Sequence, residues 1–351
     1  RPDISITTGS PNACTQCHED KTDGWAHDAL RDWGVTGRFT DLNLAKARMA
    51  ADRGDMRALP TLESLVADEA VSPLMRASVI EQMSNLGSRQ LPTAAAMLLR
   101  ADNPVLRTSA VRSMRAMPPT QRYLMLRPFI DDVSLSVRME VAQVLAGVPE
   151  SELRPKDIAE LNPLFAEYLA VQNDHLDMPS VQLQLANFWL DRGEAGKAEA
   201  ALTEALLLNP QLEPALINLV DLLRRNGNNT KASQLLSDAI QQSPDAGTLW
   251  FSQGLHQIRL GDTKAGLASL KRAAELEDEG SRHRYVYAIA LNDTGSKSEA
   301  MSVLEALNSR HPGQADVLNG LLAFARDAGD RRRYEQYRTQ LVTVLQATGA
   351  R

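Results

Sequence analysis

The residues of this chain whose types and spacing could do chemistry form one short run, Cys14-Thr15-Gln16-Cys17-His18, which holds both cysteines of the 351-residue sequence. Two thiols separated by two residues and followed directly by histidine are the attachment pattern of a c-type haem. The thiols would form thioether bonds to the porphyrin, and the imidazole would be an axial ligand of the iron. The sequence therefore predicts one covalent haem c per chain, attached through Cys14 and Cys17, with His18 as the proximal ligand.

Two other uses of paired cysteines fit this run less well. A structural zinc site takes four ligands, usually from two Cys/His pairs, and this chain has one such cluster. A thioredoxin-like dithiol belongs to a strand–helix–strand unit, and no strand pattern surrounds the motif. Zinc binding and dithiol chemistry are therefore the alternatives to haem attachment.

The second axial ligand of the expected haem is less well defined. His27 lies near the motif, on a predicted short amphipathic helix whose apolar face carries Trp25 and Trp33. His27 lies off that face and is the candidate distal ligand. Met49 and Met56, or a ligand from outside this chain, are alternatives, although methionine on such a helix usually fills a core. The two tryptophans would either line the haem edge or pack this helix against the repeats that follow.

Composition predicts an all-α fold. The chain is 43% hydrophobic but only 5% aromatic, and Ala and Leu, which favour helices, dominate it. Runs of alternating β-formers are absent, so little or no sheet is expected. The net charge of −6 and the lack of a basic stripe argue against a nucleic-acid partner. No segment is long and apolar enough to span a membrane, and no known catalytic motif is present, so an enzyme is not expected.

The C-terminal half repeats every 34 residues. A glycine marks each unit, at Gly193, Gly227, Gly261, Gly295 and Gly329. This period resembles the tetratricopeptide repeat, a pair of antiparallel helices that stacks into a superhelix because no single unit buries its apolar face. About four and a half such repeats are expected over residues 179–351, with a polar final unit. A connecting helix is expected over residues 151–178.

A second array is expected over residues 41–150, where Arg76, Arg107 and Arg138 are spaced 31 residues apart. Each arginine follows a loop that is acidic or contains proline, and each begins a helix with small residues. The pattern resembles a short HEAT repeat. We expect the arginines to pair with loop aspartates between neighbouring repeats. The fold class is thus an α-solenoid of HEAT-like and then tetratricopeptide hairpins behind a short N-terminal segment.

The order of these features is similar to that of a family of bacterial multihaem c-type cytochromes with a repeat-rich C-terminal half. The haem motif carries the resemblance, together with Pro11-Asn12-Ala13 before it and Trp25-Ala26 after it. The resemblance implies that residues 1–40 are a haem-attachment segment. It also implies that the chain is either the C-terminal portion of a larger multihaem protein or a member reduced to one haem, and it identifies no distal ligand.

The function expected from these features is that of an exported c-type cytochrome that carries electrons. Because haem attaches to this motif outside the bacterial cytoplasm, a periplasmic or extracellular location is expected. The partners would be redox proteins or other haem subunits, and the repeats could also form a homo-oligomer. A haem enzyme or sensor with an open iron site is a weaker possibility. The main alternative is a non-redox protein-interaction scaffold in which the motif is unoccupied.

The repeats offer a candidate partner groove in both functions. Tetratricopeptide arrays bind peptides on the concave side, which the first helix of each pair lines. By the register of that family, the groove residues include Asn187, Arg224, Phe251, Leu255, Tyr285 and Ile289. The middle of this set is more apolar than its ends, which favours either a hydrophobic partner segment or packing of the residues against one another.

Overall fold

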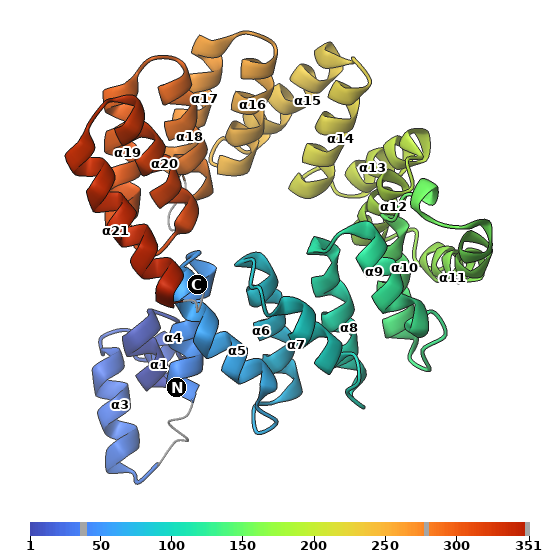
Figure 1. Ribbon diagram of the computed structural model, residues 1–351, viewed down its shortest axis with the longest axis horizontal. Coiled ribbons are helices and arrows are strands. Elements are labelled where there is room, and N and C mark those ends of the chain that lie inside the picture. Colours follow the sequence, from blue (N-terminus) through green and yellow to red (C-terminus); the bar gives the residue numbers. More distant parts are fainter. Residues whose placement is uncertain (36–40, 277–280, 348–351) are drawn as a thin grey trace.

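The computed structural model describes residues 1–35, 41–276 and 281–347, and within them all regular structure is helical. Figure 1 shows the helices following one another around an open centre, so that the C-terminal helices return to the N-terminal ones. The prediction of an all-α solenoid is confirmed. None of the helices in these ranges combines the length and the apolar character that a membrane span requires.

The ring is built from helical hairpins, each with a first and a second helix. The first helices are α4 (Asp41–Asp52), α6 (Pro73–Asn85), α8 (Pro104–Ser113), α10 (Leu135–Ala146), α12 (Pro179–Asp191), α14 (Glu213–Arg225), α16 (Gly247–Arg259), α18 (Arg282–Asp293) and α20 (Ala315–Asp327). The second helices are α5 (Leu59–Ala67), α7 (Leu91–Leu98), α9 (Pro119–Leu126), α11 (Pro155–Asn173), α13 (Ala195–Leu208), α15 (Asn229–Gln242), α17 (Thr263–Leu276), α19 (Lys297–Arg310) and α21 (Arg331–Ala347).

Short elements complete the chain. Three precede the solenoid, namely α1 (Pro2–Thr8), α2 (Ala13–Cys17) and α3 (Asp23–Asp32). Within the described residues, 3₁₀ turns lie between helices at η1 (Met56–Ala58), η2 (Met114–Ala116), η3 (Arg127–Phe129) and η4 (Glu150–Glu152). Helix α1 packs against α3 and α4, so it is the element that joins the N-terminal segment to the first hairpin.

Small residues set the close approach of the two helices in each C-terminal hairpin. Ala198, Ala232 and Ala300 are fully buried, and Gly266 takes the same place in the third unit. A Cβ atom added to Gly266 would lie 2.5 Å from Ile258 Cγ1, which is far inside van der Waals contact. The third hairpin, α16 and α17, is therefore packed more tightly than an alanine at residue 266 would allow.

The hydrophobic core continues from the first array into the second. One buried cluster extends from Leu44 through Tyr168 to Phe188 on α12, where the rings of Tyr168 and Phe188 stack with centroids 4.9 Å apart. Helix α11 lies where the connecting helix was expected. Because packing does not break at this helix, the division of the chain at residues 150 and 179 remains a prediction.

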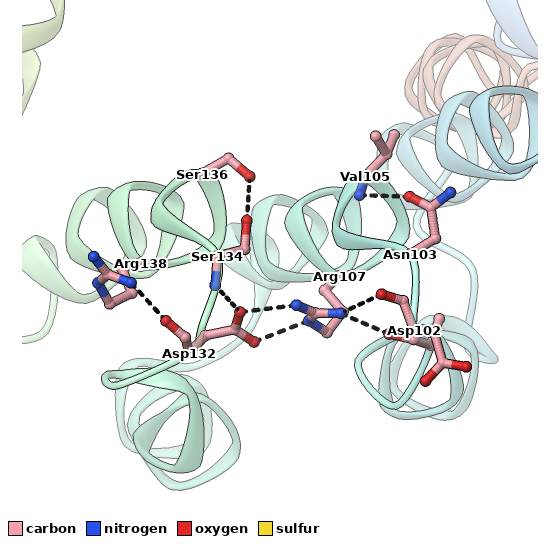
Figure 2. Close-up of polar contacts among 9 residues, drawn as sticks. Asp102, Asn103, Val105, Arg107, Asp132, Ser134, Ser136 and Arg138 are labelled. Carbon is pink, nitrogen blue, oxygen red and sulfur yellow. Dashed lines mark hydrogen bonds and ion pairs between the residues drawn. The ribbon is translucent and has the colours of Figure 1, made fainter.

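Arginine side chains bridge successive hairpins of the first array. Figure 2 shows Arg107 between Asp132 and Asp102. Arg107 donates two hydrogen bonds to the carboxylate of Asp132, at 2.9 and 2.8 Å, and two more to the carbonyls of Ala101 and Asp102. Arg138 donates to the carbonyl of Asp132 at 2.7 Å (Figure 2). It also pairs with Glu167. The expected pairing of arginine with a loop aspartate is confirmed for Arg107.

The other two bridging arginines differ from that expectation. Arg138 uses the helical Glu167 as its carboxylate partner, and Arg76 donates to the backbone carbonyl of Val66 at 2.9 Å. A guanidinium can satisfy either kind of acceptor, because it presents several donors in a fixed plane. Periodic arginine therefore predicted the bridge between hairpins, while the local loop decides which acceptor it meets.

The two ends of the solenoid meet at a seam, formed by residues 53–57 before α5 and residues 312–314 before α20. The backbone N–H of Met56 donates to the Gly313 carbonyl at 3.3 Å, and Arg57 Nη2 donates to the Pro312 carbonyl at 3.0 Å. Gln314 Nε2 donates to the carbonyl of Arg53. The 3₁₀ turn η1 also packs against α21. These contacts close the solenoid into a ring.

Breaking the buried Arg107–Asp132 pair should destabilise the fold. Burial opposes ionisation of Asp132, but its hydrogen bonds from Arg107 and the Ser134 N–H outweigh burial and hold its pKa below the ordinary 3.8. Asp132→Asn would leave a buried guanidinium without its counter-charge, and we expect a loss of about 3 kcal/mol in the free energy of unfolding, measured by urea denaturation at pH 7.

Glu167→Gln is the matched control, because its carboxylate is 37% exposed and its ion pair is worth less than about 1 kcal/mol. The stabilisation from Asp132 is present above pH 4 and is lost as pH falls through its lowered folded-state pKa. The Asp132→Asn variant should therefore lose less unfolding free energy than the wild type on acidification. Equal costs for the two variants would contradict the assigned role of the Arg107 bridge.

Gly313→Val should open the ring. The residue has φ +99°, and an added Cβ would lie 2.2 Å from Asp55 Oδ1 on the opposite side of the seam. We expect the radius of gyration and the maximum dimension, measured by small-angle X-ray scattering, to increase while the helix content seen by circular dichroism stays unchanged.

Gly295→Val provides the control for backbone strain. Gly295 also has a positive φ, +92°, but no atom lies within 4 Å of its added Cβ. Both variants force a β-branched residue into a left-handed conformation, whereas only the Gly313 variant collides across the seam. Scattering curves that are the same for both variants would disprove closure through these residues.

Candidate functional site

The motif segment folds around the side chain of Asn12. Its Oδ1 accepts hydrogen bonds from the backbone N–H groups of Cys14 and Thr15, at 3.1 and 3.2 Å, which caps the start of α2. Its Nδ2 donates to Asp23 Oδ1 at 2.7 Å and so ties α2 to the start of α3. Asn12 is buried, and it therefore fixes the geometry of the whole Cys-x-x-Cys-His run.

The functional atoms of the run face outward. Cys14 is half-buried, Cys17 is exposed, and both are free thiols. His18 is exposed, and its ring meets that of Trp25 edge to face, with centroids 5.0 Å apart. His27, the predicted distal ligand, is half-buried on α3. Nothing in the structure assigns His27 a ligand role, which stays a prediction.

Of the two alternatives for Trp25 and Trp33, packing of α3 against the repeats is not what the structure has. Trp33 is 75% exposed and Trp25 is 38% exposed, whereas Ala26 is the buried residue of this helix. Because a ten-residue helix has room for one narrow buried stripe, burying Ala26 turns the two indole rings toward solvent. The N-terminal segment meets the solenoid through α1 instead.

The predicted groove residues lie on successive first helices of the second array. Asn187 on α12 is exposed and accepts a hydrogen bond from Asn218 Nδ2 of α14 at 2.9 Å. Arg224 on α14 is half-buried near Asp221, at 3.4 Å. Of the remaining four, Phe251 is buried, and Leu255, Tyr285 and Ile289 are half-buried. Their use in binding a partner stays a prediction.

Two neighbouring hollows lie along the first helices that carry these residues. A polar hollow of about 560 Å³ is lined by residues of α8, η2, α10, α12 and α14, including Asn187 and Asn218. A second hollow of about 230 Å³ is lined by residues of α14, α16 and α18, including Arg224, Phe251 and Leu255. Both use α14, so the two hollows follow one another along the first helices.

Aromatic rings form part of the lining of the second hollow. The Phe251 ring stacks on the imidazole of His283, with centroids 4.6 Å apart, and the guanidinium of Arg282 lies 5.5 Å from the centre of the same ring. The face of Phe251 is therefore shared with a neighbouring helix. The middle of the predicted groove contains apolar residues, but His283 and Arg282 of α18 cover much of the Phe251 ring.

Charged side chains bridge the first helices that line the polar hollow. Arg112 on α8 pairs with Glu81 on α6 at 2.9 Å and with Glu140 on α10 at 2.8 Å, and the hydrogen bonds to Glu140 raise the pKa of Arg112. Arg115 pairs with Asp191 on α12 at 2.9 Å. These residues are not among the groove residues predicted from the sequence, because that prediction followed the tetratricopeptide register, which does not extend into the first array.

Comparison with known families identifies the second array. One tetratricopeptide-repeat family model matches residues 164–251 and another matches residues 251–315. Residues 164–315 are therefore tetratricopeptide repeats, which the 34-residue period predicted over residues 179–351. Proteins of this kind are in general scaffolds for protein interaction and not enzymes. The search of curated protein sequences found no match.

Several solved structures are similar to part of this chain. YrrB, described as a tetratricopeptide-repeat protein with an unusual peptide-binding site, is 19% identical over 50% of this chain and 91% of its own, with a TM-score of 0.37. MamA from Desulfovibrio magneticus is 13% identical over 49% of this chain and 96% of its own, with a TM-score of 0.39. PilF from Pseudomonas aeruginosa is 17% identical over 58% and 90%, with a TM-score of 0.41.

These findings contradict the predicted haem c. The matching models describe repeat proteins, which typically work without a cofactor, and neither points to a cytochrome. In residues 1–35, 41–276 and 281–347, no three His, Cys, Asp or Glu side chains gather into a metal site. The pattern at Cys14, Cys17 and His18 led to the wrong cofactor because the spacing of residues along the chain does not define the surrounding pocket.

Lowering the pH should destabilise the wall of the second hollow. His256 on α16 is 2% exposed, its Nε2 lies 2.9 Å from Ser233 Oγ, and burial holds its pKa below the ordinary 6.5. Arg259 and Arg224 lower the pKa further, while Asp221 and a backbone hydrogen bond at Asn229 oppose the shift. Below pH 6.5 the unfolded chain takes up a proton that the folded chain resists, so folding stability is lost.

The variant His256→Gln should show a smaller loss of unfolding free energy between pH 7 and pH 5 than the wild type. His175→Gln is the control, since His175 is exposed. Urea denaturation at each pH measures the difference. An unchanged pH dependence in His256→Gln, with the normal loss in the control, would show that another group governs stability in this range.

Proposed function

We propose that this chain is a protein-interaction scaffold that holds an extended polypeptide segment along the first helices of its ring. The observation that carries the proposal is the pair of adjoining hollows on α8 to α18, which share α14. Solenoids present their first helices as an extended concave surface of this kind, and such surfaces commonly bind peptides. The tetratricopeptide repeats of residues 164–315 support the same function.

The lining of the hollows suggests the chemistry of the bound segment. The polar hollow offers the amides of Asn187 and Asn218, which can pair with a peptide backbone. It also contains Arg225, an exposed cation. The second hollow offers Leu255 beside Arg224 and Arg259. A segment with an apolar side chain flanked by acidic or amide groups would complement both hollows.

Electron transfer is not part of this proposal. That function depended on a haem at Cys14, Cys17 and His18, and the haem prediction is wrong for this chain. The expected export to the periplasm or cell exterior, and the expected redox partners, rested on the same haem. The scaffold function, by contrast, draws on the repeats alone.

A display screen of random dodecapeptides against the intact chain tests the proposal. Selected peptides would be synthesised with a fluorophore, and their dissociation constants measured by fluorescence anisotropy. Leu255→Asp places a carboxylate in the second hollow, and we expect it to weaken binding at least tenfold, because it removes an apolar contact and changes the charge of the hollow.

Leu207→Asp is the matched control, since Leu207 lies on the second helix α13 and is 74% exposed. It should leave the dissociation constant unchanged. The proposal is disproved if no peptide binds below about 100 μM, or if the selected peptides respond to Leu207→Asp and not to Leu255→Asp.

A further inference from the structure

A large hollow lies where the N-terminal segment meets the first hairpins. It is separate from the two hollows on the first helices α8 to α18. It has a volume of about 1010 Å³, at the upper end of the range for small-molecule sites. Its walls come from α1, from α4, from the end of α5 with the loop that follows it, and from the start of α6. The apolar part of the wall consists of Ile4, Leu44, Met49, Leu65, Val71 and Met75.

Arg48 on α4 lines this hollow, and among residues 1–35, 41–276 and 281–347 it has no carboxylate partner in an ion pair. Its Nη1 lies 3.8 Å from the sulfur of Met75, which is a weak acceptor. Its Nε is buried and has no hydrogen-bond partner within the part of the chain that the structure describes. The guanidinium of Arg107, in the same array, makes four hydrogen bonds to oxygen acceptors.

A buried donor without an acceptor is unfavourable, and a charged donor more so. Arg48 therefore lies in an environment suited to an anion that the chain itself does not supply. The apolar walls on either side of Arg48 would exclude water from that anion, which strengthens a charge-assisted hydrogen bond. The two features together fit a ligand with one anionic end and an apolar body.

The other charged groups of the hollow limit the charge of that ligand. Asp52 accepts a hydrogen bond from Gln82 at 2.7 Å, and Asp68 accepts one from the Ala70 N–H at 2.9 Å. Arg1 pairs with Asp3 at 2.7 Å, and Arg53 also lines the wall. Two carboxylates facing the same space would repel a dianion or polyanion, so a monoanion is favoured.

We propose that this hollow is a binding site for a fatty-acid-type carboxylate. The carboxylate accepts hydrogen bonds from Arg48 Nε and Nη2, the same pair of donors that Arg107 presents to Asp132. The hydrocarbon chain lies along Met49, Leu65 and Met75. The site does not include the hollows assigned to a partner polypeptide, and its occupancy is measured without one.

Isothermal titration calorimetry of the intact chain with octanoate tests the site, because octanoate is monomeric at millimolar concentration. We expect one site per chain. Arg48→Met should weaken octanoate binding roughly 10- to 100-fold, the range expected for a hydrogen bond to a charged group. 1-Octanol should bind more weakly than octanoate because it lacks the charge. Octyl phosphate, largely a dianion at pH 8, should also bind more weakly because Asp52 and Asp68 repel it.

Arg100→Met is the matched control, since Arg100 is an exposed arginine of the same array outside the hollow. It should bind octanoate like the wild type. Met75→Glu is a second, independent variant, which places a carboxylate next to Arg48 and should abolish binding while raising the melting temperature. This variant keeps the proposal testable if Arg48→Met fails to fold.

Three results would overturn the proposal. The first is no octanoate binding to the wild type up to 10 mM. The second is equal affinity for octanoate and 1-octanol, which would show apolar adsorption without recognition of the charge. The third is octanoate binding to Met75→Glu as tight as to the wild type.

Discussion

Closure of the solenoid at the seam is the constraint on which the rest of the structure depends. A linear array of hairpins contacts only its neighbours, and its end units need polar outer faces. Here residues 53–57 and residues 312–314 cover one another, so the first and last hairpins are neighbours as well. The rotations from one hairpin to the next must therefore add up to a full turn. A change of spacing between hairpins anywhere in the ring would shift residues 53–57 relative to residues 312–314.

The two arrays hold their spacing by different means. In the second array, buried small residues such as Ala198 and Gly266 let the two helices of a hairpin touch, and close packing sets their separation. In the first array, guanidinium groups bridge hairpins, with Arg107 joining the loop before α8 to the loop before α10. A planar group with several donors fixes direction as well as distance, which suits hairpins whose helices are short.

The sequence was most informative where structure repeats. The glycines at 34-residue intervals predicted the hairpins of the second array, and the periodic position of Arg107 predicted its contact with a loop aspartate. A periodic pattern gives this information because the same local geometry occurs several times along the chain.

The seam has no such pattern. Gly313 follows Pro312 in a turn that looks like the end of an ordinary repeat, and its partner Asp55 is far away in the chain. Arg48 was likewise unremarkable in sequence, because a missing counter-charge is a property of the folded environment.

The Cys-x-x-Cys-His run misled for a different reason. A single local pattern predicted a cofactor from residue spacing alone, and no second pattern near Asn12 and Asp23 supported that prediction.

The chemistry of the seam determines how the ring responds to a partner. Among the described residues, the buried apolar side chains on the two sides, such as Ala58 and Val317, belong to separate cores, and no core cluster crosses the seam. What joins the ends is a small set of hydrogen bonds, each worth about 1 kcal/mol net of water. The hairpins are held by continuous cores, so the seam is the place where the ring opens at least cost. A polypeptide that binds along the first helices favours whichever curvature fits it best, and only the difference in its affinity for the closed and open rings can shift the balance between them.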